Sequence, residues 1–367
     1  MFNKNRFICS VFPVCILIIV SCTVHPIIND NKLKNQFQAQ NPSSVSSNNA
    51  TQIQVVQFCN TTIQPVNYSS GLLSPRVYAG ILEPNSYLIS NFGPLRDDIR
   101  SYIIDNNLSA SVYVENLRNG VNIGINQNRG YFPASLNKLP IAVLVMENIE
   151  DGKWTMDTIL PIHENEKSSA SGMLYLSNET QLAIRELMQL MLKESDNTAF
   201  NVLYDAIDKD EERKLLEYYD VKINLDYPHR RLEFANHTDQ VTAISMYNLF
   251  SSLYLSTVLA DPKDSEYILS LLANSDFDIK RIANLPDNVT VAQKYGEYYA
   301  DGTKQFHDCG IVYIDQTKIF YCVMTRDLDA EDAKGVIGHI VNYIYNYVVY
   351  TRAELDELKN HNSRTKS

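Results

Sequence analysis

Apolar residues recur with the period of a strand at both ends of the stretch 88–350, and with the period of a helix between those ends. Near the beginning, an amphipathic helix over 95–103 precedes strands over 111–116 and 121–125, which an Asn-Gly pair joins in a tight turn. No low-complexity segment interrupts the pattern. The sequence therefore predicts one folded domain over 88–350.

The middle of the domain has the pattern of helices, and its end returns to strands. Residues 136–149 form a mostly apolar run, which predicts a buried helix, and further helical stripes follow as far as 253. Strands are expected over 289–294 and in a hairpin around residue 315, before a last helix with an apolar stripe over 336–348. This order predicts an α+β fold: an antiparallel sheet from both ends of the domain, an inserted helical lobe, and a cleft where they meet.

The first residues have the features of an export signal. Lys4 and Arg6 precede an apolar run over 7–20 that is too short to span a bilayer, so residues 1–22 are expected to be a signal peptide. The last four of these residues, Ile-Val-Ser-Cys, resemble the lipobox of bacterial lipoproteins, whose cysteine carries the lipid. That resemblance implies an exported protein anchored to the membrane through Cys22, with ordinary cleavage and free secretion as the alternative.

Polar segments flank the domain on both sides. No charged residue occurs between Lys34 and Arg76, where Asn, Gln, Ser and Thr are frequent. Such a composition buries little apolar surface, so residues 23–87 are expected to be a flexible tether. Residues 351–367 are expected to be a polar C-terminal tail.

Composition narrows the range of partners. The chain has 367 residues, 45% of them hydrophobic, and its 32 Lys and Arg against 43 Asp and Glu give a net charge of −11. An acidic chain without a basic stripe is not suited to the phosphate backbone, so no nucleic acid partner is expected. The seven histidines are scattered and no cysteine has metal-ligand spacing, so we expect neither a metal nor another cofactor.

Two of the six cysteines occupy the expected C-terminal hairpin. Cys309 and Cys322 lie on two apolar runs that would pair around residue 315. If the turn consists of residues 315 and 316, the two sulfurs lie opposite each other and an oxidising compartment could join them. A turn of four residues would misalign them, so a disulfide and a pair of buried free thiols both remain open.

A serine and a lysine stand three residues apart just before the buried helix, at 135 and 138. At this separation they share one face of a helix, so the ammonium group can lie beside the hydroxyl. The N-terminus of the helix also stabilises negative charge on the serine oxygen. Both effects are those that activate a serine as a nucleophile.

Two further motifs carry polar groups. Ser-Asp-Asn at 195–197 follows an amphipathic helix and offers a hydroxyl to relay a proton and an amide to hold a carbonyl, although alone it is more often a helix cap. Lys-Tyr-Gly at 294–296 ends a strand. The lysine can hold an anionic substrate group, and the glycine lets a substrate backbone approach the strand.

In this order and on these elements, the motifs resemble the Ser-x-x-Lys, Ser-Asp-Asn and Lys-Thr-Gly motifs of class A β-lactamases and penicillin-binding proteins. The resemblance covers roughly residues 95–350. It implies acyl transfer through a covalent ester on Ser135, with Lys138 taking or relaying the serine proton. Ser195 would pass a proton to the leaving nitrogen, Asn197 would orient the substrate amide, and Lys294 would hold an anionic group.

The resemblance also implies an oxyanion hole and a substrate class. The backbone N–H groups of Ser135 and Glu297 would bind the oxyanion, and Gly296 would admit the substrate. Substrates would be β-lactams or cell-wall peptides, and the chemistry would need no cofactor. For Lys138 to act as a base, burial or a neighbouring cation such as Lys294 must lower its pKa.

The chain departs from the family pattern at three carboxylate or aromatic positions. The Glu-x-x-Leu-Asn loop of class A β-lactamases has no clean copy, and Glu233 with Asn236 is the nearest candidate for the deacylating base. A structural carboxylate paired with a neighbouring arginine is the alternative. Tyr295 replaces a small hydroxyl residue, and Glu297 would repel an anionic substrate unless a cation neutralises it.

These observations favour an exported serine hydrolase of the class A β-lactamase type. A D,D-peptidase or transpeptidase that acts on cell-wall peptides is the closest alternative, because it uses the same acylation. A non-catalytic binding protein on the same fold is the alternative from another class, and the departures at Glu233, Tyr295 and Glu297 motivate it.

Overall fold

The computed structural model describes residues 57–58, 61–62, 91–219, 240–300, 302–315 and 317–364, with side chains from residue 91 to residue 351. Residues 1–64 and 65–367 form two units. In the first, the strands β1 (Gln57–Phe58) and β2 (Thr61–Thr62) pair antiparallel. The predictions for the signal peptide, for Cys22 and for Glu233 lie outside the described residues. No helix among the described residues is long and apolar enough to cross a membrane.

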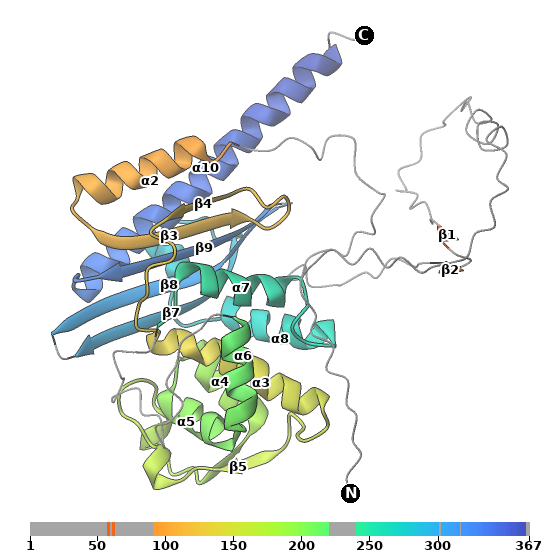
Figure 1. Cartoon of the computed structure of the whole chain (residues 1–367), viewed down its shortest axis with the longest axis vertical. Helices are drawn as coiled ribbons and strands as arrows, with labels where there is room; N and C mark the ends of the chain where they lie inside the picture. The colour runs from red at the N-terminus through yellow and green to blue at the C-terminus, as the bar shows by residue number, and fades with distance from the viewer. Residues whose placement is uncertain are drawn as a thin grey trace, which may run out of the picture. The chain divides into compact units, whose positions relative to one another are not determined.

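The second unit is built on an antiparallel sheet of five strands, in the order β4-β3-β9-β8-β7 (Figure 1). The strands are β3 (Ser109–Asn116), β4 (Asn122–Ile125), β7 (Thr290–Ala300), β8 (Thr303–Ile314) and β9 (Thr317–Arg326). The first two come from the beginning of the domain and the other three from its end. The predicted α+β fold, with a sheet from both ends and a helical insert, is therefore confirmed.

Each face of the sheet is covered by helices, because alternate residues of the strands are apolar on both sides. The helices α2 (Gly93–Asp105) and α10 (Ala330–Arg364) lie across one face (Figure 1). The predicted stripe of α10 is buried against that face, from Val336 to Val348. The backbone of α10 continues as a helix to Arg364.

The helical lobe packs against the other face, where α7 (Ala243–Tyr254) contacts the sheet. The remaining helices and short strands of the insert are α3 (Lys138–Glu150), β5 (Ile159–Pro161), β6 (Gln181–Ala183), α4 (Ile184–Lys193), α5 (Asn197–Ala206), α6 (Lys209–Tyr218), α8 (Pro262–Ala273) and α9 (Ile279–Ile282). Three single 3₁₀ turns, η1 (Ala134–Asn137), η2 (Glu164–Glu166) and η3 (Leu174–Leu176), complete it. The helix expected over 136–149 begins at Lys138, because its predicted first turn is the tighter η1.

The C-terminal hairpin resolves the question of the two cysteines. Ile314 pairs with Thr317, so only two residues connect β8 to β9. In this register Cys309 lies opposite Cys322, and the two sulfurs are joined in a disulfide. The two-residue turn, rather than the four-residue turn, is therefore the one that the chain adopts.

Candidate active site

Ser135 lies half-buried in η1, at the point where the chain enters the buried helix α3. Lys138 is the first residue of α3, and its side chain is fully buried. Its Nζ lies 2.8 Å from Ser135 Oγ, within hydrogen-bond distance. The separation of three residues thus brings the amine to the hydroxyl, as the sequence pattern predicts.

The Ser-Asp-Asn motif forms the beginning of α5, and its middle residue is the helix cap. Asp196 accepts hydrogen bonds from Ala199 N at 2.8 Å and from Leu174 N at 2.9 Å. Because Asp196 satisfies the helix end and also holds η3, the residues on either side of it are free to turn towards Lys138. Ser195 adopts the left-handed backbone conformation that this change of direction requires, with φ of 57°.

Lys138 connects the first motif to the second. Its Nζ lies 3.2 Å from Ser195 Oγ, 2.9 Å from Ser195 O and 2.6 Å from Asn197 Oδ1. With Ser135 Oγ, four oxygen atoms therefore surround a nitrogen that carries at most three hydrogens. This arrangement suits an amine that exchanges a proton with its neighbours.

Lys294 joins the same cluster from the middle of the edge strand β7, and not from a strand end as predicted, because β7 continues in its pairing with β8 to Ala300. Its side chain is also fully buried. Its Nζ donates to Ser195 Oγ at 3.0 Å and to Tyr295 O at 2.9 Å. The structure therefore brings Ser135, Lys138, Ser195, Asn197 and Lys294 together, although they are far apart in the sequence.

Burial lowers the pKa values of both lysines. Removal from water lowers the pKa of Lys138 well below its ordinary value, the charge of Lys294 lowers it further, and Asp196 partly opposes these effects. Burial lowers the pKa of Lys294 to about 7, although Asp308 and Glu297 favour its charged form. At neutral pH one of the two amines can therefore be neutral and accept a proton.

Gly296 allows β7 to pass directly beside the serine. A Cβ atom at this position would lie 2.9 Å from Pro133 O and 3.2 Å from Ser135 N. A side chain of any size would push β7 away from η1. The glycine of the third motif is thus required by close packing of the strand against the segment that carries Ser135.

The two departures on β7 occupy different environments. Tyr295 is partly buried and stacks on Phe277, with ring centres 4.6 Å apart, while Lys294 Nζ lies 4.4 Å from the Tyr295 ring centre. Glu297 is exposed to solvent. The aromatic stack is a feature that sequence reasoning missed, because Phe277 lies outside every motif.

Sequence reasoning also missed a buried carboxyl group near Lys294, that of Asp308. Asp308 is fully buried on β8, where it accepts a hydrogen bond from the Tyr321 hydroxyl at 2.6 Å. Burial raises the pKa of Asp308 to about 8, and Lys294 partly offsets this rise. The only sequence signal was the placement of a polar residue within an otherwise apolar strand.

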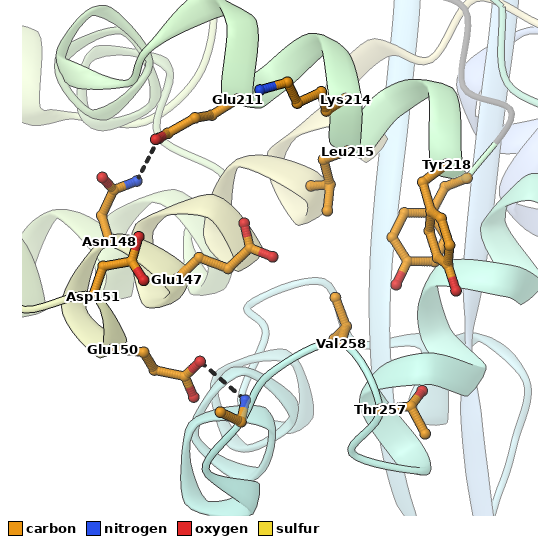
Figure 2. A pocket seen from close by; sticks show the side chains of 12 residues that line it. Glu147, Asn148, Glu150, Asp151, Glu211, Lys214, Leu215, Tyr218, Thr257 and Val258 are labelled. Carbon is orange, nitrogen blue, oxygen red and sulfur yellow. Dashed lines mark hydrogen bonds between the residues drawn. The ribbon is translucent and has the colours of Figure 1, made fainter. Parts of the chain in front are cut away.

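Two further features of the described residues bear on a competing site. Within the described ranges, no cluster of three or more His, Cys, Asp or Glu side chains could hold a metal ion. A cavity of about 550 Å³ lies between α3, α6 and the segment 257–260, and it contains none of the motif residues (Figure 2). Its walls carry the carboxylates Glu147, Glu150, Asp151 and Glu211.

Comparison with known proteins places the chain in a family. Residues 94–348 match the family described as "Beta-lactamase enzyme family". No curated protein is significantly similar to the chain.

Several solved structures share the fold. PBP-A is 20% identical to this chain in sequence, and the two structures match with a TM-score of 0.63 over 70% of this chain and 97% of PBP-A. The TLA-1 extended-spectrum β-lactamase is 20% identical, with a TM-score of 0.64 over 71% of this chain and 100% of the other. A β-lactamase from Chitinophaga pinensis is 20% identical, with a TM-score of 0.62 over 70% and 100%.

Proposed function

The chain belongs to the beta-lactamase enzyme family, and from this premise we propose that it is a serine hydrolase that acts on β-lactams or related amides through an acyl ester on Ser135. One observation carries the proposal. The Nζ of a fully buried lysine, Lys138, lies 2.8 Å from the oxygen of the proposed nucleophile.

Acylation begins when Ser135 Oγ attacks the substrate carbonyl carbon and Lys138 Nζ takes the hydroxyl proton. A neutral amine is needed for this step, and the lowered pKa of Lys138 supplies it. The new C–O bond gives a tetrahedral intermediate. As that intermediate collapses, the C–N bond breaks and the Ser195 hydroxyl gives its proton to the leaving nitrogen. Lys138 or Lys294, both within hydrogen-bond distance of Ser195 Oγ, then gives Ser195 a new proton.

The proposed oxyanion hole consists of the backbone N–H groups of Ser135 and Glu297. The close approach of Gly296 to Ser135 N supports this assignment, because it brings the two segments side by side. Each such donor lowers the barrier by about 3 kcal/mol. Asn197 would orient the substrate amide, and Lys294 would hold an anionic substrate group.

Rapid hydrolysis of the acyl ester distinguishes a β-lactamase from the closest alternative, an enzyme that acts on cell-wall peptides. A D,D-peptidase or transpeptidase would share the acylation step, and a single-residue mutant of PBP-A, which has the same fold, is described as an acyl-enzyme complex with penicillin G. That likeness favours acylation by penicillins but does not choose the acceptor. Glu233 remains the proposed deacylating base for a β-lactamase, and an export signal with a lipid anchor at Cys22 remains part of the proposal.

Labelling with a fluorescent penicillin tests the acylation step. We expect wild-type protein to gain one label per chain, and Ser135→Ala and Lys138→Met to gain none, although both variants keep the thermal unfolding temperature within a few degrees. A fluorophosphonate probe serves as a second electrophile. Equal labelling of wild type and Ser135→Ala by both probes would contradict the proposal.

A chromogenic cephalosporin then distinguishes the two enzyme classes. Steady turnover, with no adduct in the intact mass, supports a β-lactamase. A lasting adduct on Ser135 supports a penicillin-binding protein, and Glu233→Gln should convert turnover into such an adduct if Glu233 is the deacylating base.

A further inference from the structure

A second pocket lies beside the segment that leads into Ser135, where β7 turns into β8. It has a volume of about 250 Å³. The lining residues are Gly130, Tyr131, Phe132, Gln240, Tyr298, Gly302, Thr303, Gln305, Arg326 and Asp327. We propose that this pocket binds the carboxylate group of a small organic acid or of an acyl-side substituent of the substrate.

Arg326 provides the positive charge. Its Nη2 donates to Gly130 O at 3.2 Å, and its Nε is buried without a hydrogen-bond partner. None of the ion pairs among the described residues includes this guanidinium, which instead lies 5.3 Å from the ring centre of Tyr131. A half-buried guanidinium without a counter-ion retains donors for a planar anion.

Gln305 provides a second set of donors. The residue is only 5% exposed, and its Oε1 accepts a hydrogen bond from Phe132 N at 3.0 Å. That bond fixes which end of the amide faces the main chain. No described residue accepts a hydrogen bond from the amide nitrogen. Its hydrogens are therefore available to an acceptor in the pocket.

The surrounding charges favour a single carboxylate over a dianion. His307 is fully buried beside Tyr131, and burial lowers its pKa to about 4, so it adds no charge at neutral pH. Arg129 lies over the same tyrosine ring, but it does not line this pocket. Asp327, which is exposed at the rim, would repel a second negative charge.

The walls favour a ligand with an apolar body. The rings of Phe132 and Tyr298 lie 4.6 Å apart and both line the pocket. An aromatic carboxylate could therefore place its ring against them and its charge towards Arg326. The volume of about 250 Å³ is large enough for such a molecule.

The position of the pocket along β7 allows the carboxylate to come from either of two sources. Lys294, Gly296 and Tyr298 occupy alternate positions of the strand, so they face the same side at steps of about 7 Å. The pocket begins one such step beyond Gly296, which packs against Ser135. A carboxylate on the acyl side of a substrate bound at Ser135 could reach the pocket, and this first source rests on the proposed function. The second source, a free organic acid, could fill the pocket whether or not Ser135 is acylated.

Binding of benzoate to the full chain tests the site without any catalysis. We expect saturable binding by calorimetry or ligand-observed NMR, at least about tenfold weaker in Arg326→Met, with partial recovery in Arg326→Lys. Arg129→Met is the matched control and should bind like wild type. Gln305→Glu should also lose binding, because it keeps the acceptor for Phe132 N but replaces the donor with a negative charge that Arg326 can pair with.

Acylation kinetics identify the source. The acylation rate with a penicillin that carries a second carboxylate on its acyl side chain is divided by the rate with benzylpenicillin. If the substrate supplies the carboxylate, Arg326→Met lowers this ratio at least about tenfold and Arg129→Met leaves it unchanged. If benzoate binding depends on Arg326 but the ratio does not, the ligand is a free acid.

The proposal is overturned if wild type does not bind benzoate and the ratio is the same in wild type and Arg326→Met, or if Arg326→Met binds benzoate as tightly as wild type. Failure of both penicillins to acylate Ser135 would refute the proposed function alone. The benzoate measurement would then still decide whether the pocket binds a carboxylate.

Discussion

Ser195 Oγ lies between two buried lysine nitrogens, 3.2 Å from Lys138 and 3.0 Å from Lys294. Two ammonium groups this close repel each other, and water does not screen them because both side chains are fully buried. The protein can hold both only because at least one is neutral for much of the time. The hydroxyl between them is therefore suited to pass a proton in either direction.

The charge of Lys294 sets the alkaline limit of acylation by anionic substrates. Its pKa is lowered to about 7, so the cation is present below that pH and is lost as the pH rises through it. We expect the acylation rate with benzylpenicillin to fall by up to about tenfold between about pH 6 and pH 9. In Lys294→Arg the guanidinium stays charged over this range and the fall should disappear.

Stopped-flow measurement of acylation at several pH values checks this prediction. An uncharged fluorophosphonate serves as the control, because it has no anionic group for Lys294 to hold. The same alkaline fall in Lys294→Arg and in wild type would show that another group titrates.

At the scale of elements, the sequence predicts helices and strands well where periodicity and burial agree. The stripe over 336–348 appears where expected, because local pattern and tertiary packing favour the same structure. The prediction of a tight Asn-Gly turn was wrong: Glu115 pairs with Asn122, so four residues, 117–120, connect the two strands, and of the Asn-Gly pair only Gly120 has a positive φ. The path of the segment 171–174 has no such local signal. Its position depends on contacts with Asp196, which is distant in the sequence.

Gly172 tests how strongly that segment holds α5. It has φ of +82°, and a Cβ atom would lie 2.0 Å from Asp196 Oδ2. We expect Gly172→Ala to lower the free energy of unfolding by about 3 kcal/mol and to reduce penicillin labelling of the folded protein, because Ser195 and Asn197 move with Asp196.

Gly152→Ala is the matched control for Gly172→Ala. Gly152 has a similar φ of +71°, but nothing lies within 4 Å of its added Cβ. Gly152→Ala should therefore lower the free energy of unfolding by only about 1 kcal/mol, because only the backbone conformation is strained, and leave penicillin labelling unchanged. Urea unfolding measures both variants, and equal losses would mean that the contact with Asp196 contributes nothing.

At the scale of the whole molecule, the order of the elements was sufficient to predict the sheet and the inserted lobe. The three motifs were sufficient to predict which five side chains converge. The stack of Tyr295 on Phe277 and the buried Asp308 were not predictable, because each depends on how segments distant in the sequence pack together. Glu233 lies outside the described residues, so its proximity to Ser135 stays a prediction.

The acidic chain also concentrates charge at the cavity between α3 and α6 (Figure 2). There, burial and then the charges of Glu150, Asp151 and Glu211 raise the pKa of Glu147 to about 7. In the unfolded chain a glutamate titrates near its ordinary value of about 4.3. The folded state therefore binds more protons between these two values, and its stability falls as the pH rises through this window.

Glu147→Gln removes the group whose ionisation lowers the stability of the folded state at higher pH. Because Glu147 is only partly buried, solvent screening reduces the gain, and we expect about 1 kcal/mol of added stability at about pH 8, or roughly 3 °C in unfolding temperature. Near pH 4.5 the variant and wild type should unfold at nearly the same temperature, since the folded glutamate is then protonated. Glu179→Gln, at an exposed position, is the matched control and should leave the unfolding temperature unchanged. Calorimetric scans between about pH 4.5 and pH 8 measure the unfolding temperatures. If Glu147→Gln raised the unfolding temperature equally at both pH values, the prediction would be wrong, because the added stability would not come from ionisation.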